Sequence, residues 1–415
     1  MSMVLNQPAI RQRFPRLLAL LLMMLYPFLI TGCGDGKGTA EPLRERLETG
    51  AVRLTHAELD LRPLTFDTVA EWDVWGTGAP YLFNDVTDVV GGEDTFFLLD
   101  SGNHEVVEFT PDGSLRNSFG REGSGPGEFR YPLQMTMHED RLWISDVGNV
   151  RFSIYNTDGS SVRDVRWPAG SRLVNSFEIT PRGGILHGGV WPLTVAELAE
   201  QEPLYYLSEF AGGGMREEGS MVHLDTLAIM RAEPWSGFVI RSEEGDERGW
   251  FDPPVFSPQF YWSASHEMVV TVTSPDYRFE VRDMQGAIVL EIVCPSPDLR
   301  ITDAHRRWYF EFFAQTALSG SEPFTLTSDS KARFEFARVM PAIAGITIDG
   351  AGNIYVLANT PEPGVTRLDL FSSEGIYRGS VEEIGLPAAF IDDGTILLRD
   401  PDLSGLDRFR TGIIR

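Results

Sequence analysis

The sequence predicts an all-β fold, a six-bladed β-propeller whose N-terminal strand completes the last blade. Two observations lead to this class. The stretches FLLDSGNHEVVEFTPDGSL (Phe97–Leu115) and WISDVGNVRFSIYNTDGSS (Trp143–Ser161) align without a gap at an offset of 46 residues. From residue 71 onward, short runs of strand-forming residues alternate with turns rich in Gly, Pro, Asn and Asp. A repeat of this length, filled with short strands, is typical of a propeller blade.

Residues 1–33 have the features of a bacterial lipoprotein signal peptide. Three Arg residues precede the apolar run Leu17–Ile30, which is too short to span a bilayer. The run ends in LITGC, which resembles the lipobox of bacterial lipoproteins, and the resemblance implies that Cys33 is lipidated. Acyl chains would anchor the domain, since each buried methylene contributes about 0.8 kcal/mol. An ordinary signal peptide with an incidental Cys is the alternative.

Gly34, and not Asp, directly follows Cys33, which favours delivery of a lipoprotein to the outer membrane. We therefore expect a protein of the bacterial cell envelope that is bound to the membrane by its lipid anchor alone. Cys294 is the only other cysteine, so a lipidated Cys33 leaves it without a disulfide partner. Because Cys294 follows an apolar run and has no His near it in sequence, we expect a buried thiol without a catalytic role.

The net charge excludes nucleic acid as a partner. The chain carries −25, and removal of the signal, which holds three Arg and no acidic residue, lowers this to −28. Nucleic-acid affinity comes from neutralising phosphates with Lys and Arg, and an acidic domain also repels anionic headgroups. The expected partners are an envelope protein, a glycan or a small ligand, and the domain is expected to be a monomer.

The chain divides into the signal (1–33), a linker and lead-in (34–66) and the propeller (67–415). In the lead-in, Pro42–Glu48 has the length for one or two helical turns. The last blade has only three strands of its own, and the unpaired strand Val69–Trp75 would complete it and remove exposed sheet edges. Four-stranded blades are predicted over residues 83–120, 132–168, 176–227, 259–293 and 344–381, with the three-stranded unit over 388–413.

Two segments interrupt the repeat. The irregular insert 191–258 contains a helix candidate opened by the capping box Thr194-x-x-Glu197, a run of three Gly, and the acidic loop Glu243–Glu247. The second segment, 302–318, predicts a helix with aromatic residues four positions apart, Trp308 with Phe312 and Tyr309 with Phe313. Such a helix either packs over one end of the propeller or forms an aromatic platform for a ligand.

The string GREGSGPGEFRYPLQM (Gly120–Met135) and the Asp-x-Gly-Asn turn that follows it resemble the NHL repeat and related six-bladed propeller lipoproteins. The turn occurs at Asp100–Asn103 and Asp146–Asn149, and later blades lack it. We interpret it as structural, because the Asp side chain can accept N–H bonds within the turn while Gly takes a left-handed conformation.

The inner strands of a propeller converge on a central channel, which is the usual place for a site. Polar residues at the channel ends of these strands are Asn84, Asp85, Gln134, Asn175 and Gln259. The resemblance to propeller lactonases implies a divalent cation there, Ca²⁺ or Zn²⁺. A hard cation needs several oxygen ligands, and Asp85 is the best single candidate, with Glu178 two residues deeper.

No catalytic set is recognisable in the sequence. The seven His residues form no pair at zinc-ligand spacing, and no Gly-x-Ser-x-Gly elbow or phosphate-binding loop occurs. The favoured hypothesis is a binding or scaffold module without a cofactor. The alternative hypothesis is a metal-dependent hydrolase or lyase with its site in the channel.

Overall fold

The computed structural model describes the chain from residue 41 onward with short gaps. The signal segment with Cys33, Asn175 and the predicted capping box lie outside the described residues. The described ranges are 41–73, 81–167, 176–181, 183–191, 204–210, 223–231, 233–234, 236–243, 245–265, 267–316, 325–382, 384–391, 394–401 and 407–415.

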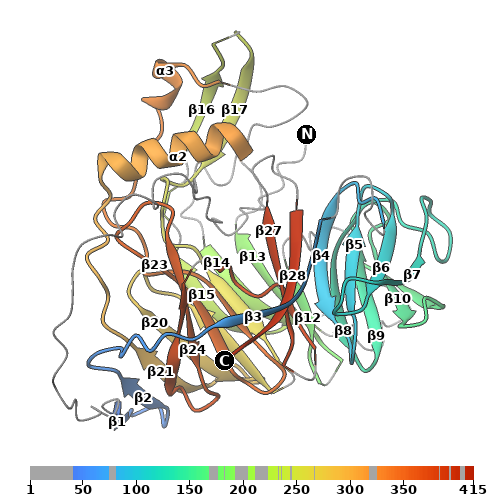
Figure 1. The fold of residues 1–415 in the computed structure, drawn as a ribbon, viewed down its shortest axis with the longest axis horizontal. Coiled ribbons are helices and arrows are strands. Elements are labelled where there is room, and N and C mark those ends of the chain that lie inside the picture. The colour runs from blue at the N-terminus through green and yellow to red at the C-terminus, as the bar shows by residue number, and fades with distance from the viewer. Residues whose placement is uncertain are drawn as a thin grey trace, which may run out of the picture.

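Six antiparallel blades surround a central axis, so the fold is the predicted six-bladed β-propeller (Figure 1). The first strand of each blade lies innermost, and first strands of neighbouring blades contact each other, as β4 does β8. Blade one comprises β4 (Val86–Gly91), β5 (Phe96–Asp100), β6 (Glu105–Phe109) and β7 (Leu115–Phe119); blade two comprises β8 (Pro132–His138), β9 (Arg141–Asp146), β10 (Arg151–Asn156) and β11 (Ser161–Arg166); blade three comprises β12 (Phe177–Ile179), β13 (Ile185–Trp191), β14 (Leu204–Phe210) and β15 (His223–Arg231).

In blades one, two, four and five the predicted blade ranges agree with the observed ones to within three residues. Short strands between Gly and Asp turns are defined by local sequence, which explains the agreement. Blade four contains β18 (Tyr261–Ala264), β19 (Met268–Val272), β20 (Arg278–Asp283) and β21 (Ile288–Val293); blade five contains β22 (Ile343–Ile348), β23 (Ile354–Asn359), β24 (Thr366–Phe371) and β25 (Tyr377–Glu382); blade six contains β26 (Ala389–Phe390), β27 (Ile396–Pro401), β28 (Asp407–Ile414) and β3 (Phe66–Asp73).

The ring closes as the sequence predicts. Strand β3, from the N-terminal part of the chain, pairs antiparallel with β28 and becomes the outer strand of blade six. Trp72 lies opposite Phe409 in this pairing, and Thr65 and Arg415 exchange two backbone hydrogen bonds just beyond it. Closure in this way pairs the edge that β28 would otherwise expose.

The lead-in is β structure and not helix, so the expectation of helical turns over Pro42–Glu48 is wrong. Strand β1 (Leu43–Arg46) pairs with β2 (Val52–Thr55), and β2 lies parallel to β21 on the outer edge of blade four. The physical reason is burial, because Leu54 is only 1% exposed in the cluster between blades four and five. On β2, the Arg53 guanidinium binds the Glu291 carboxylate of β21 at 2.6 Å.

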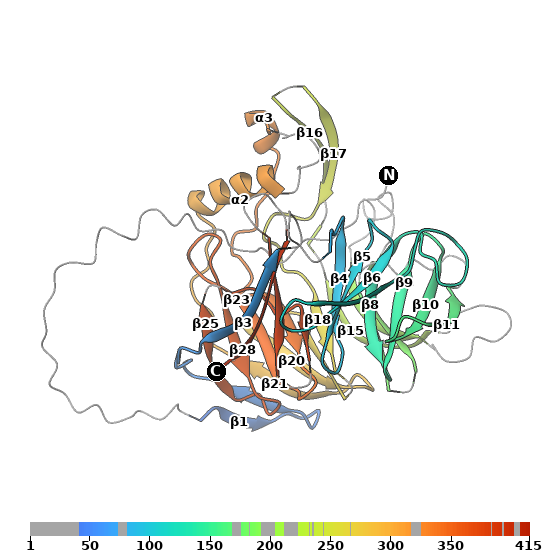
Figure 2. The same ribbon diagram turned by 45° about the vertical axis from the view of Figure 1, so that its right-hand side comes forward.

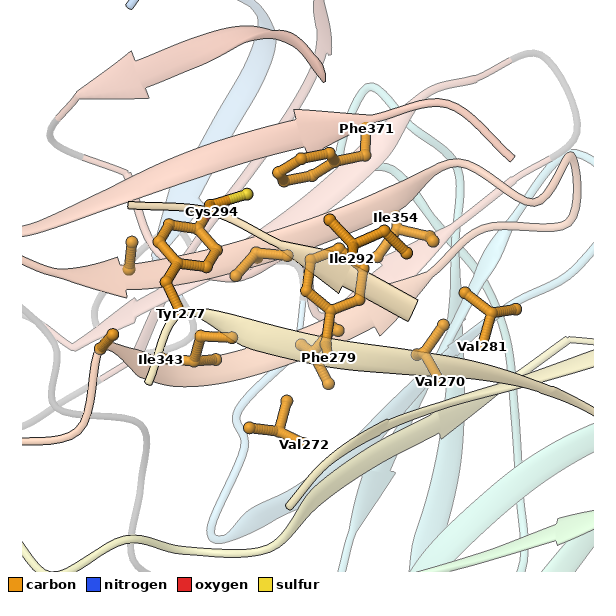
Figure 3. Close-up of a cluster of buried hydrophobic side chains, with 14 of the residues drawn as sticks. Val270, Val272, Tyr277, Phe279, Val281, Ile292, Cys294, Ile343, Ile354 and Phe371 are labelled. Carbon is orange, nitrogen blue, oxygen red and sulfur yellow. The ribbon is translucent and has the colours of Figure 1, made fainter. Parts of the chain in front are cut away.

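The blades are held together by apolar side chains between their faces. Figure 3 shows the largest such cluster, where Phe279 and Ile292 of blade four face Ile354 and Phe371 of blade five. All four side chains are fully buried. The rings of Phe279 and Phe371 meet edge to face at 5.2 Å, a favourable aromatic geometry.

The repeated Asp-x-Gly-Asn turn is structural, as we inferred, but the expectation of a left-handed Gly is wrong. The left-handed residues of these turns are His104 (φ 59°) and Val150 (φ 53°), and glycine is needed at 102 because a Cβ there would lie 2.6 Å from the Asn84 side chain. The buried Asp100 carboxylate accepts backbone N–H bonds from Asn84 at 2.9 Å, from Asp85 at 3.0 Å and from Asn103 at 3.0 Å. Asp146 in blade two receives the equivalent three bonds. Each Asp therefore ties the turn between the second and third strands to the loop that enters the innermost strand.

The two inserts form a separate unit, the crown, on one face of the propeller (Figures 1 and 2). The crown consists of the hairpin β16 (Ser236–Arg241)–β17 (Glu247–Asp252), helix α2 (Asp303–Thr316) and the short helix α3 (Ser328–Lys331). Within the segment 191–258, β14 and β15 belong to blade three, as the predicted range 176–227 for this blade implied, and the acidic loop is the turn of the hairpin β16–β17.

Candidate functional site

The predicted channel residues that the structure describes come from blades one, two and four. Asn84 and Asp85 are exposed on the loop before β4, where their backbone N–H groups bind Asp100. Gln134 is partly buried on β8. Gln259, before β18, accepts a hydrogen bond at 2.9 Å from the Tyr205 hydroxyl of blade three. Asn175 lies outside the described residues.

The channel instead brings together two deeper carboxyls, Asp88 of β4 and Glu178 of β12. The Asp88 carboxylate accepts the N–H of its neighbour Val89 at 2.9 Å and that of Met135 on β8 at 2.7 Å. Glu178 accepts a hydrogen bond from the Thr136 hydroxyl, also on β8. The innermost strands of blades one, two and three are thus linked through these two side chains.

Both carboxyls hold their protons more tightly than usual. Burial raises the pKa of Glu178 to about 7, and the nearby Asp88 charge adds to this while the Thr136 hydroxyl opposes it. Burial likewise raises the pKa of Asp88 to about 6, against the two backbone N–H bonds and the Arg399 charge. Near neutral pH, Glu178 is therefore partly protonated and can donate or accept a proton.

A β-bulge explains why Asp88 could not be predicted as a channel residue from the sequence. The register between β4 and β5 shifts between Val86 and Asp88, which changes the alternation of faces along the strand. Glu178 was noticed, and the structure places it deep in the ring as expected. The signal that could have identified Asp88 is an acidic residue inside an otherwise apolar inner strand.

Asp88, Glu178 and Asp85 are carboxyls on or next to the inner strands that could supply oxygen ligands to a cation. Hard divalent cations take six or more oxygen ligands. Within the described residues, no group of three or more His, Cys, Asp or Glu side chains is arranged to hold a metal ion. A metal at Asp85 therefore stays a prediction.

The crown has its own apolar core. Tyr309 and Phe310 of α2 pack against residues of the hairpin and of the segment after α3. The ring of Phe334 contacts the rings of Phe238, Trp250 and Tyr309. The hairpin is also tied to α3, because the Arg241 N–H donates to the Ser330 hydroxyl at 2.7 Å and this hydroxyl donates back to the Arg241 carbonyl at 3.1 Å.

A small pocket lies where α2 of the crown meets blade five. Its enclosed volume is about 10 Å³, which is room for about one water molecule. Trp308 of α2 forms one wall and stacks on Phe312 at 5.3 Å, which confirms one of the two predicted aromatic pairs. The side chain of Phe313, in the other pair, lies outside the described set. The pocket is lined by Phe256, His305, Trp308, Met340, Asn359, Glu362, Gly364, Val365 and Thr366.

His305 and Thr366 are buried polar residues that line this pocket, and His305 is only 3% exposed. Its Nδ1 accepts the backbone N–H of Thr302 at 3.2 Å, so Nδ1 carries no proton. Burial lowers the pKa of His305, which keeps the ring neutral. The single ring proton is therefore on Nε2, and Nε2 has no hydrogen-bond partner among the described residues.

Two backbone features shape the same pocket. Phe256 has φ of 63°, a left-handed conformation that is rare and strained for a bulky residue, and it stacks on Trp308 at 6.4 Å. Gly364 has φ of +74°, and a Cβ at this position would lie 2.3 Å from the Trp308 indole nitrogen. The turn can approach the indole this closely only because residue 364 is glycine.

Cys294 is buried, as the sequence predicts, and burial raises the pKa of its thiol far above the usual value. Among the described residues, no helix is both long enough and apolar enough to cross a bilayer.

Comparisons with known proteins add little beyond the fold. No protein-family model matches the sequence, and no curated protein matches it. A solved structure of a Bacteroides fragilis protein thought to be exported has 12% identity and a TM-score of 0.45, covering 88% of this chain and 98% of that one. Streptogramin B lyase has 9% identity and a TM-score of 0.40, covering 85% and 98%. Similarities this weak carry no argument about function, so the fold assignment depends on the sheet topology described above.

Proposed function

We propose that the protein is a binding module of the cell envelope of a Gram-negative bacterium, anchored by lipid at Cys33, which recognises a protein, glycan or small ligand with its crown. The observation that supports this is the crown itself. It is built from two inserts with a separate aromatic core, and no blade needs it for closure. Elements added to a complete scaffold are common carriers of binding function.

The position of β1 relative to the crown also supports the proposal that the crown is the binding surface. In both ribbon views β1 lies at the end of the molecule away from the crown (Figures 1 and 2). Only residues 34–42 separate Cys33 from β1, and a chain of this length reaches about 30 Å at most. A lipid at Cys33 would keep the β1 end close to the membrane and direct the crown away from it.

Photo-crosslinking in living cells tests the crown as the contact surface. A photoreactive amino acid replaces Val239 on the crown hairpin or, as the matched control, Val162 on the outer strand of blade two. The two valines are similarly exposed, at 42% and 39%, and both lie on strands. We expect a discrete adduct from position 239 and none from position 162. Equal labelling at both positions, or no adduct at position 239, would contradict the proposal.

A second candidate function is a metal-dependent hydrolase or lyase with its site in the channel. The pair Asp88 and Glu178 favours it, because two carboxyls with raised pKa values can exchange protons and supply ligand oxygens. Elemental analysis of the purified protein separates the candidates. Stoichiometric Ca²⁺ or Zn²⁺ that is lost in Asp85→Ala or Glu178→Gln supports the enzyme, and its absence from protein purified without chelators argues against it.

A further inference from the structure

We infer that the free edge of strand β1 is a docking site for an extended segment of another protein that carries a Lys or Arg opposite Glu45. Strand β1 ends a six-stranded sheet, and no strand among the described residues pairs with its outer side. All four of its residues are exposed, and Leu43, at 71%, is the most exposed large apolar side chain that the structure describes. This edge lies away from the crown and is therefore a second, separate surface (Figures 1 and 2).

The backbone hydrogen bonds of β1 show which groups the edge offers. The Leu47 N–H donates to the Ala51 carbonyl at 2.9 Å, just beyond the pairing of β1 with β2. Bonding to one partner alternates along an antiparallel strand, so Glu45, two residues earlier, also directs its backbone groups toward β2. The N–H and C=O groups of Arg44 and Arg46 therefore point outward. These donors and acceptors can pair with an incoming strand, as in β-strand addition.

A row of charged side chains crosses this sheet and ends at Glu45. Glu45, Arg53 and Glu291 lie opposite one another on β1, β2 and β21. The Arg53 guanidinium lies 3.3 Å from the Glu45 carboxylate and 2.6 Å from that of Glu291. Arg278 of β20 also lies 2.6 Å from Glu291. Charges alternate along this row and the Glu45 side chain is still 60% exposed, so the position opposite it on an added strand favours a cation.

The same charges exclude a second copy of this chain as the occupant. Residues opposite each other in a sheet share a face, so a twofold axis between two antiparallel copies of β1 must place one residue opposite itself. The registers with the largest overlap centre on Arg44 or on Glu45, and either one places like charges directly opposite each other. Such pairs are destabilising. A foreign strand that reads acidic, basic, acidic opposite Arg44, Glu45 and Arg46 meets an opposite charge at every position.

Saturation-transfer NMR with the purified full chain and two capped peptides tests the inference. The probe, Thr-Val-Glu-Lys-Glu-Val-Thr, is palindromic, so it presents its Lys to Glu45 whether it binds parallel or antiparallel to β1. The control peptide, Thr-Val-Lys-Glu-Lys-Val-Thr, has the charges inverted. We expect the probe to bind about fivefold more tightly than the control. The probe is anionic and the control cationic, so general attraction to this acidic protein would give the opposite preference.

Variants of the edge locate the binding. The triple variant Arg44→Glu/Glu45→Lys/Arg46→Glu should reverse the preference, whereas Glu48→Lys, in the exposed turn after β1, should not change it. Arg46→Pro and Arg46→Ala remove the same charge, but only Pro removes the outward N–H, and its loss breaks no hydrogen bond between β1 and β2. Binding of the probe should be lost in Arg46→Pro and weakened by less than about threefold in Arg46→Ala.

The contrary outcomes are equally specific. If neither peptide binds at about 5 mM, if both bind equally, or if Arg46→Pro binds the probe as well as Arg46→Ala does, the inference is wrong. A dimer that forms with rising protein concentration and is lost in Arg46→Pro would show that a second copy occupies the edge, which would also overturn it. None of these results affects the crown, because its crosslink at position 239 is at the other end of the molecule.

Discussion

Trp72 of β3 lies opposite Phe409 of β28, with their rings stacked at a centroid distance of 6.1 Å. The same indole stacks on Phe109 of blade one at 6.1 Å and covers Gly113 in the neighbouring hairpin turn. One side chain therefore joins the N-terminal strand, the C-terminal strand and the first blade. The closure of the ring depends on this contact more than on any exposed residue of β3.

We predict that Trp72→Ala lowers the free energy of unfolding by about 3 kcal/mol, because it leaves a cavity at the junction of blades six and one. The control is Val69→Ala on the same strand, whose side chain is 57% exposed and should change stability by less than about 0.5 kcal/mol. Chemical denaturation measures both. Similar midpoints for the two variants would show that the indole does not support closure.

A second prediction concerns the strand pair added to blade four. Leu54→Ala on β2 should destabilise the protein by about 3 kcal/mol, since this side chain is 1% exposed and packs beside Gly375. Arg44→Ala on the exposed strand β1 should have almost no effect. If Leu54→Ala changes the melting temperature as little as Arg44→Ala does, strands β1 and β2 do not contribute to the stability of the fold in solution.

Residues 43–55 belong to the segment predicted to be a linker and lead-in, yet they form strands β1 and β2. Removing them would take away β1 and β2, uncover the edge of β21 and leave the buried Glu291 carboxylate without Arg53. Such a truncation therefore costs stability in its own right, and it is not a neutral control for loss of the closing strand.

The third prediction is a pH dependence that originates at Glu178. Its pKa is about 7 in the folded protein and about 4.5 when unfolded, so the folded state binds the proton more tightly. Stability contributed by this group is complete below about pH 4.5 and falls as the pH rises toward 7. Glu178→Gln should remove this slope and stabilise the protein at pH 8 by about 1–3 kcal/mol relative to the unsubstituted chain.

Denaturation curves between pH 4 and pH 8 measure this effect. Glu139→Gln is the control, because its carboxylate is 77% exposed in a hairpin turn and the substitution should leave the slope unchanged. A Glu178→Gln profile parallel to that of the unsubstituted protein would mean that the carboxyl is ionised in the channel at all these pH values.

The fourth prediction addresses the anchor. Cys33→Ser should leave the protein in the soluble periplasmic fraction, because the variant cannot be diacylated. Fractionation and mass spectrometry of the N-terminal peptide measure this. Continued membrane association of the variant with an uncleaved signal would rule out the lipobox interpretation and favour an ordinary signal that stays attached.

The blades could be predicted because their signals are local. Asp100 and Asp146 each organise a turn within a few residues, and the strands on either side follow from alternation and turn chemistry. Helix α2 was also predictable, from its N-terminal polar residues and its aromatic spacing. These features need no knowledge of distant parts of the chain.

The rest depends on contacts that local patterns do not encode. Strand β2 is defined by pairing with β21, more than 200 residues away, and its four residues have no turn signal that marks a blade. Asp88 was missed because a bulge reversed its face. The crown pocket combines Phe256, His305 and Asn359 from three separate segments, so only the folded chain brings its donor and acceptor groups together.

The pairing of β3 with β28 also constrains biogenesis. Translation produces β3 early and its partner only after all the other blades, so blade six cannot assemble until β28 has been synthesised and exported. During that interval β3 is an unpaired strand with a large aromatic side chain, the kind of segment that pairs with other chains. Yield in the cell should therefore depend on chaperones that hold the incomplete ring apart from its neighbours.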